Sequence, residues 1–115
     1  MIENFYSEIG SDAKDVIKRL GGESTVVRFV KKFAQDKSFF ELKSAMENGD
    51  TETAFRAAHT LKGISMNLGF DRLYEASYDI TEALRIKETD KAAQKLPEVE
   101  KRYNEIICGI QRYYN

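Results

Sequence analysis

The chain contains a single histidine, His59, and the residues that follow it at helical spacing suit phosphoryl chemistry. An ordinary exposed imidazole is largely neutral at pH 7, and a neutral ring nitrogen is a nucleophile. Lys62 and Gly63 follow at i+3 and i+4, so on a helix both share the face of His59. An ammonium one turn away neutralises part of the charge on the oxygens of a phosphoryl group in transfer. The three residues therefore suit transfer of a phosphoryl group to and from the imidazole.

Gly63 is unusual because it stands inside an expected helix. Glycine destabilises a helix interior by up to about 1 kcal/mol relative to alanine, which suggests a steric reason for its presence. One interpretation is that the missing side chain lets another protein approach His59 closely. The other is that it lets a neighbouring helix of the same chain pack closely.

Further residues near His59 predict a docking surface. Phe55 lies one turn before His59 and Met66 two turns after it, on the same face, where they would form an exposed apolar patch. Arg56 flanks this face and Asn67 lies at its edge. An alternative for Phe55 is that it packs under the N-terminal segment. The apolar stripe on the opposite side of the helix, which we expect in the core, consists of Ala57, Leu61, Ile64 and Leu68.

Hydrophobic periodicity and capping residues predict helices along the whole chain. The expected segments are 12–20, 23–36, 38–48, 51–68, 71–87 and one from residue 89 onward. The second and third are compatible with two helices or with one long, bent helix. Pro97 either kinks the last helix near Ala93 or marks its true start.

These segments predict an all-α fold with a single domain over residues 1–115. One proline and seven glycines in 115 residues are few for a chain rich in turns. Short connections between long helices favour antiparallel neighbours. We therefore expect an antiparallel four-helix bundle with an additional short N-terminal helix.

Composition excludes several function classes. The 18 basic and 19 acidic residues leave a net charge of −1, which provides no field for binding nucleic acid. No apolar run approaches the roughly 20 residues of a membrane span, and the N-terminus lacks the features of a signal peptide. The single cysteine, Cys108, cannot form an internal disulfide, so we expect a cytoplasmic protein in which Cys108 packs against neighbouring side chains. One histidine cannot supply a di-iron site, and we expect neither a metal nor a cofactor.

One local pattern resembles a known family. The segment Ala58-His59-Thr60-Leu61-Lys62-Gly63, with Ser65, Asn67-Leu68-Gly69 and Leu73, closely resembles the signature of histidine-containing phosphotransfer (HPt) domains. Arg19-Leu20-Gly21-Gly22 and Gly49-Asp50 are also similar to recurrent segments of this family, and the resemblance extends over about residues 16–84.

The resemblance implies a helical bundle that relays a phosphoryl group between aspartates of receiver domains through one histidine. It implies that His59 is the phosphoacceptor, that Lys62 assists the phosphoryl group and that Gly63 keeps the approach clear. The implied partners are receiver domains, with a hybrid sensor histidine kinase as a further candidate, and we expect a monomer. The chain has no glycine-rich nucleotide loop, so we expect a phosphoryl carrier that does not phosphorylate itself from ATP.

The sequence departs from the family pattern at two positions. Met66 stands where members often have a small residue, so it either adds to the docking surface or narrows it. Thr81 stands where many members have a glutamine or glutamate that orients the imidazole, and its side chain is shorter. We expect Thr81 to be an ordinary helix residue, with Tyr78 or Arg85 as possible substitutes. The alternative function is an interaction module that binds a receiver or another signalling protein through the face from Phe55 to Met66 without being phosphorylated.

Overall fold

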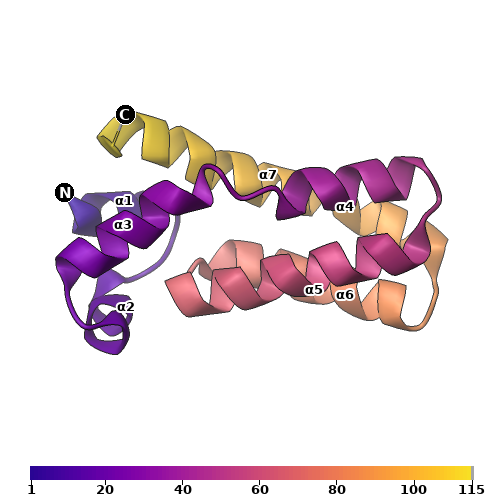
Figure 1. Ribbon diagram of the computed structural model, residues 1–115, viewed down its shortest axis with the longest axis horizontal. Coiled ribbons are helices and arrows are strands. Elements are labelled where there is room, and N and C mark those ends of the chain that lie inside the picture. The colour runs from indigo at the N-terminus through magenta and orange to yellow at the C-terminus, as the bar shows by residue number, and fades with distance from the viewer. Residues whose placement is uncertain (115) are drawn as a thin grey trace.

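The computed structural model describes residues 1–114 and contains seven α-helices in that part of the chain (Figure 1). They are α1 (Ile2–Glu8), α2 (Ala13–Leu20), α3 (Glu23–Phe33), α4 (Ser38–Glu47), α5 (Thr51–Leu68), α6 (Asp71–Arg85) and α7 (Thr89–Tyr114). Residues 1–114 include no β-strand, which confirms the predicted all-α fold.

The four C-terminal helices form the bundle. α5 packs against both α4 and α6, α6 packs against α7, and α7 returns to contact α4. The turns between these helices are short, so successive helices run antiparallel along the long axis of the molecule (Figure 1). The three N-terminal helices gather at the end of the bundle where α5 ends and α6 begins (Figure 1).

The N-terminal region differs from the expectation of one short helix. The structure adds α1, whose buried residues Ile2, Phe5 and Tyr6 pack on the core. It also separates α3 from α4, and between them the Asp36 side chain accepts a hydrogen bond from the backbone N–H of Ser38, the first residue of α4, at 2.8 Å. The structure thus contains α1 in addition to the short N-terminal helix that the sequence predicts, which is α2.

Helix α7 runs continuously through Pro97. The helix begins at Thr89, so Pro97 does not mark its start; the proline has no N–H to bond the carbonyl of Ala93. Cys108 is exposed on this helix, which does not agree with the expectation that it packs against neighbouring side chains. None of the helices within residues 1–114 is long and apolar enough to cross a membrane.

Aromatic rings fill the end of the bundle where the N-terminal helices pack. Phe5 meets Tyr6, Phe70 and Tyr114 edge to face, with ring centroids 5.3–6.2 Å apart. Phe5 also packs on Gly109 of α7, where an added Cβ would lie 2.9 Å from a Phe5 ring carbon. Gly109 therefore allows α1 to approach α7, and α1 becomes part of the core.

Candidate functional site

Helix α5, which carries His59, begins and ends where the sequence predicts. The Asp50 carboxylate accepts a hydrogen bond from the backbone N–H of Thr53 at 3.1 Å and caps its N-terminus. Gly69 ends the helix with a φ of +67°, a left-handed conformation that glycine adopts without strain. The residues that α5 buries in the bundle are Ala54, Ala57, Ala58, Leu61, Ser65 and Leu68. Their burial orients the opposite face of α5, with His59, outward.

His59 is exposed, and neither of its ring nitrogens is hydrogen-bonded to another residue within positions 1–114. Its ring lies nearly parallel to that of Phe55, with centroids 6.0 Å apart and an interplanar angle of 17°. The guanidinium of Arg85 on α6 lies 5.0 Å from the Phe55 ring centroid. Phe55 is therefore half-buried between the imidazole and α6, and it contacts α6 rather than packing under the N-terminal segment. The imidazole nitrogens are free to react with a molecule that approaches from solvent.

Lys62 lies on the same face and contributes positive charge. Its Nζ is 5.4 Å from the centroid of the Tyr78 ring on α6, a cation–π contact. Within the described residues Lys62 takes part in no ion pair, so no carboxylate neutralises its ammonium. The charge is available to the oxygens of a phosphoryl group bound near His59.

Arg56 is exposed but differs from Lys62 in its partners. Its guanidinium pairs with Glu52 at 2.8 Å and also donates to the Thr53 hydroxyl at 3.3 Å. Both partners lie toward the start of α5, on the side of Arg56 away from Gly63. Lys62 is therefore the unpaired cation of this face, and Arg56 is the paired one.

Gly63 faces open space. An added Cβ would have no heavy atom of a neighbouring side chain or helix within 4 Å. Close packing of another helix in this chain therefore does not explain the glycine. Of the two interpretations of Gly63, clearance for an approaching molecule is the one that agrees with the geometry.

Met66 and Asn67 complete the face at the end of α5. Both are exposed, Met66 with 57% of its surface accessible. The backbone carbonyls of these two residues accept hydrogen bonds from the Arg19 guanidinium of α2, at 3.2 and 2.6 Å. Arg19 thereby bonds two of the last four carbonyls of α5, which have no i+4 donor within the helix. This role was not predicted, although the similarity of 19–22 to a recurrent family segment singled out the region.

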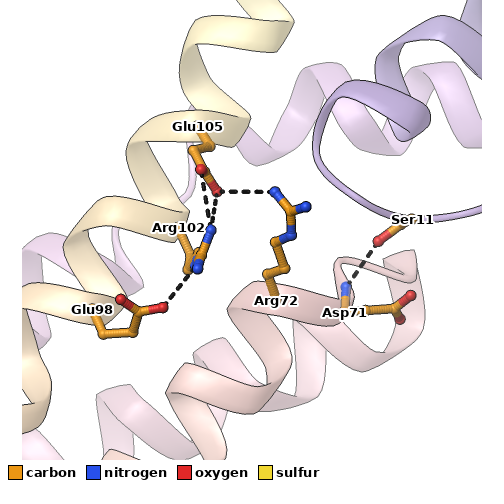
Figure 2. A network of polar contacts seen from close by, with 6 residues as sticks. All are labelled: Ser11, Asp71, Arg72, Glu98, Arg102 and Glu105. Atoms are coloured by element: carbon orange, nitrogen blue, oxygen red, sulfur yellow. Dashed lines mark hydrogen bonds and ion pairs between the residues drawn. The ribbon is translucent and has the colours of Figure 1, made fainter.

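A second contact secures the same end of α5. The Tyr6 hydroxyl of α1 donates to the carbonyl of Leu68 at 2.6 Å in the interior, and burial raises the pKa of this hydroxyl above its usual value. The Ser11 hydroxyl accepts a hydrogen bond from the backbone N–H of Asp71 at 3.1 Å, at the first residue of α6 (Figure 2). The N-terminal helices thus hold the α5–α6 turn.

Charged side chains connect the start of α6 to α7. Arg72 of α6 lies 4.0 Å from the carboxylate of Glu105, which also accepts hydrogen bonds from Arg102 (Figure 2). Arg102 bonds Glu98 as well, at 2.7 Å, so one guanidinium bridges two carboxylates of α7. The hydrogen bonds that Arg102 donates to Glu98 and Glu105 raise the pKa of its guanidinium. Arg72 is the residue through which α6, the helix that carries Tyr78 and Arg85, contacts this network.

Thr81 does not orient His59. It is fully buried, and its hydroxyl donates to the carbonyl of Ser77 on its own helix at 2.5 Å. Tyr78 and Arg85, the two suggested substitutes, contact Lys62 and Phe55 respectively. The α6 side chains therefore support the neighbours of His59 and leave the imidazole itself without a protein hydrogen bond.

Metal-ligating side chains do not gather near this face. Within residues 1–114 there is no group of three or more histidine, cysteine, aspartate or glutamate side chains that could hold a metal ion.

Comparison with known proteins agrees with this arrangement of residues. The family model described as the Hpt domain matches residues 35–107, which is more than half of the 115-residue chain and includes α4, α5 and α6. No curated protein and no solved structure matches the chain. An exposed histidine in the second helix of the matched bundle, together with the extent of the match, shows that this chain belongs to the Hpt domain family.

Proposed function

We propose that this protein accepts a phosphoryl group on His59 from the phosphoaspartate of one receiver domain and passes it to the aspartate of another. Phosphotransfer in two-component phosphorelays is the general function of the Hpt domain family. The observation that carries the assignment is one face of α5, where an exposed imidazole stands beside the unpaired ammonium of Lys62 and the open space at Gly63.

The chemistry needs no group besides the two proteins and the receiver's own metal ion. A neutral ring nitrogen of His59 attacks the phosphorus of the acyl phosphate, and the bond from phosphorus to the aspartate oxygen breaks. The aspartate leaves as a carboxylate, and the other ring nitrogen of His59 releases its proton to solvent. The same steps in reverse transfer the group to a second aspartate. Lys62 stabilises the charge on the phosphoryl oxygens during both transfers.

Four further residues would contact the receiver in this proposal. Phe55 and Met66 supply apolar surface on either side of the imidazole, and Arg56 and Asn67 supply polar groups at its edge. We propose that the protein acts as a cytoplasmic monomer without a cofactor and without autokinase activity, since its sequence has no glycine-rich nucleotide loop. Receiver domains and a hybrid sensor histidine kinase are its proposed partners.

The test uses a panel of purified receiver domains labelled at their aspartate with radioactive acetyl phosphate. The wild-type protein should acquire acid-labile, base-stable phosphate from at least one of them. The His59→Gln variant should acquire none while it retains the helical circular dichroism and most of the receiver affinity. A wild-type protein that binds a receiver but never takes the label would instead be an interaction module, and the phosphotransfer assignment would be wrong.

A further inference from the structure

The orientation of the His59 ring depends on the side chains beside it on α5. A helical side chain leans toward the N-terminus of its helix and covers the turn before its own Cα. The positions that the imidazole covers are therefore i−4 and i−3, which are Phe55 and Arg56. What these two side chains do consequently decides how freely the imidazole can turn.

Phe55 is the neighbour that contacts the ring. The two rings are nearly parallel, at 17°, with their centroids 6.0 Å apart, which is within the range of an offset aromatic stack. The Arg56 guanidinium instead pairs with Glu52, and the Lys62 ammonium one turn later lies over the ring of Tyr78. Within residues 1–114 the imidazole has no hydrogen bond, so the stack is the contact that orients it.

Phe55 has supports of its own. It is half-buried and packs against the hydrophobic core of the bundle. The guanidinium of Arg85 on α6 lies 5.0 Å from its ring centroid, and that guanidinium is itself hydrogen-bonded to Glu82 at 3.1 Å. A ring packed in this way has fewer available rotamers than an exposed imidazole, so Phe55 can restrict the movement of His59.

A contact with the face of an imidazole leaves both of its nitrogens free. The lone pair that attacks phosphorus lies in the plane of the ring, whereas Phe55 contacts the ring face. A hydrogen bond with a protein group would occupy one of the two nitrogens. The stack therefore sets the plane in which the attacking lone pair points and leaves the nucleophile unoccupied.

The number of orientations open to an unsupported imidazole sets the size of the effect. On a helix χ1 of histidine adopts about two wells, and χ2 adopts about two. An exposed imidazole without contacts is therefore distributed over about four orientations. An aromatic pair favours its own geometry by about two- to tenfold, which is enough for one of these orientations to predominate.

We infer that Phe55 is a positioning residue for phosphoryl transfer, because its ring holds the imidazole of His59 in the orientation that meets the phosphoaspartate of a docked receiver. Arg85 supports Phe55 from α6. The inference rests on the proposed function and gives Phe55 a role besides that of apolar surface. A side chain that only supplies apolar surface changes the affinity for the receiver, whereas a positioning side chain changes the rate of transfer within the complex.

The kinetic test compares variants that keep or remove the aromatic ring. Phe55→Leu removes the ring and keeps an apolar side chain, and Phe55→Tyr keeps the ring. Phe40→Leu is the matched control, since Phe40 is exposed on α4 and its ring contacts Phe39 and Tyr103. Each protein is assayed with the labelled receiver that exchanges phosphate fastest with the wild type. Each is also assayed with phosphoramidate, a small donor that can approach the imidazole from any direction.

We expect Phe55→Leu to lower kcat for transfer from the receiver about fourfold, the factor by which one orientation out of about four is depleted. Phe55→Tyr should retain most of kcat, and Phe40→Leu should retain all of it. Labelling by phosphoramidate should be equal in the wild type and Phe55→Leu, because a small donor requires no fixed orientation. A raised KM with the wild-type kcat in Phe55→Leu would overturn the inference, as would an equal loss of kcat in Phe55→Tyr.

A spectroscopic measurement reports the ring orientation directly, and the single histidine makes its proton signals unambiguous. In the wild type the vicinal Hα–Hβ couplings of His59 should correspond to one χ1 rotamer. In Phe55→Leu they should move toward the average of two rotamers, and in Phe55→Tyr they should remain as in the wild type. Averaged couplings in the wild type would overturn the inference without any receiver present.

Failure of this inference differs from failure of the proposed function. A wild-type protein that takes the label from a receiver, with an equal kcat in Phe55→Leu, would refute the inference alone. A wild-type protein that takes the label from no receiver would refute the proposed function, and with it any role of Phe55 in the transfer.

Discussion

The substitution Gly63→Ala should make the protein more stable and less active. Alanine in a helix interior is favoured over glycine by about 1 kcal/mol. An added Cβ at Gly63 meets no heavy atom within 4 Å, so no clash offsets this gain. For a chain of 115 residues the entropy of unfolding is about 0.24 kcal/mol/K, so the melting temperature should rise by about 4 °C.

The same methyl group should slow phosphoryl transfer from a receiver. It would stand one turn from the imidazole, on the face of α5 that the receiver must approach. A misplacement of about 1 Å at a reacting centre lowers rates by about a hundredfold, so we expect a loss of about tenfold in kcat/KM for Gly63→Ala and about a hundredfold for Gly63→Leu.

The assay measures thermal unfolding and receiver-dependent labelling of the same preparations. Asn104→Ala is the matched control: Asn104 is exposed in the interior of α7, and its replacement should stabilise the helix by about 0.6 kcal/mol without slowing transfer. If Gly63→Ala destabilises the protein, the glycine serves packing within the chain and our account of it is refuted. If Gly63→Leu transfers phosphate at the wild-type rate, the open space at Gly63 is unrelated to the approach of the receiver.

Three further predictions concern stability. Gly109→Ala should lower the free energy of unfolding by about 1–3 kcal/mol, because the added Cβ would lie 2.9 Å from the buried Phe5 ring. The effect is opposite in sign to that of Gly63→Ala. Chemical denaturation measures the free energy of unfolding, and an increase would contradict the prediction. Tyr6→Phe removes the buried hydrogen bond to the end of α5 and should lower the melting temperature by about 4–8 °C, from a loss of about 1–2 kcal/mol. Hydrogen bonds from Thr53 hold the pKa of Asp50 below its usual value, so its stabilising effect is present above about pH 4 and is lost as the pH falls through the lowered pKa. The difference in melting temperature between wild type and Asp50→Ala should therefore be larger at pH 7 than at pH 2, and an equal difference at both would contradict this.

The helices of the bundle were predictable because each has a strong local signal. Helix α5 has an aspartate cap at Asp50, a terminating glycine at Gly69 and an apolar stripe between them, and the structure has the helix at Thr51–Leu68 as expected. Helix α1 was missed because its seven residues make fewer than two turns, too few for a periodic pattern. Its stability comes from contacts with distant residues, such as Phe5 on Gly109.

The candidate site was predictable to the extent that helical geometry alone determines it. Helical spacing places His59, Lys62 and Gly63 on one outward face, and the structure has them there. Helical spacing does not determine where long side chains go. The pairing of Arg56 with Glu52 and the contact of Arg85 with Phe55 therefore came only from the structure. Arg19 was out of reach for the same reason, because the carbonyls that it bonds are 47 and 48 residues away in the sequence.

The contacts that hold the α5–α6 turn have a consequence for the order in which the chain assembles. They join residues 47 to 62 positions apart, and closing a loop of this length costs on the order of 3–4 kcal/mol of chain entropy. The α5–α6 turn, by contrast, consists of only the two residues between Leu68 and Asp71. Because short loops close before long ones, we expect the α5–α6 hairpin to form first and the first twenty residues to dock on it afterwards.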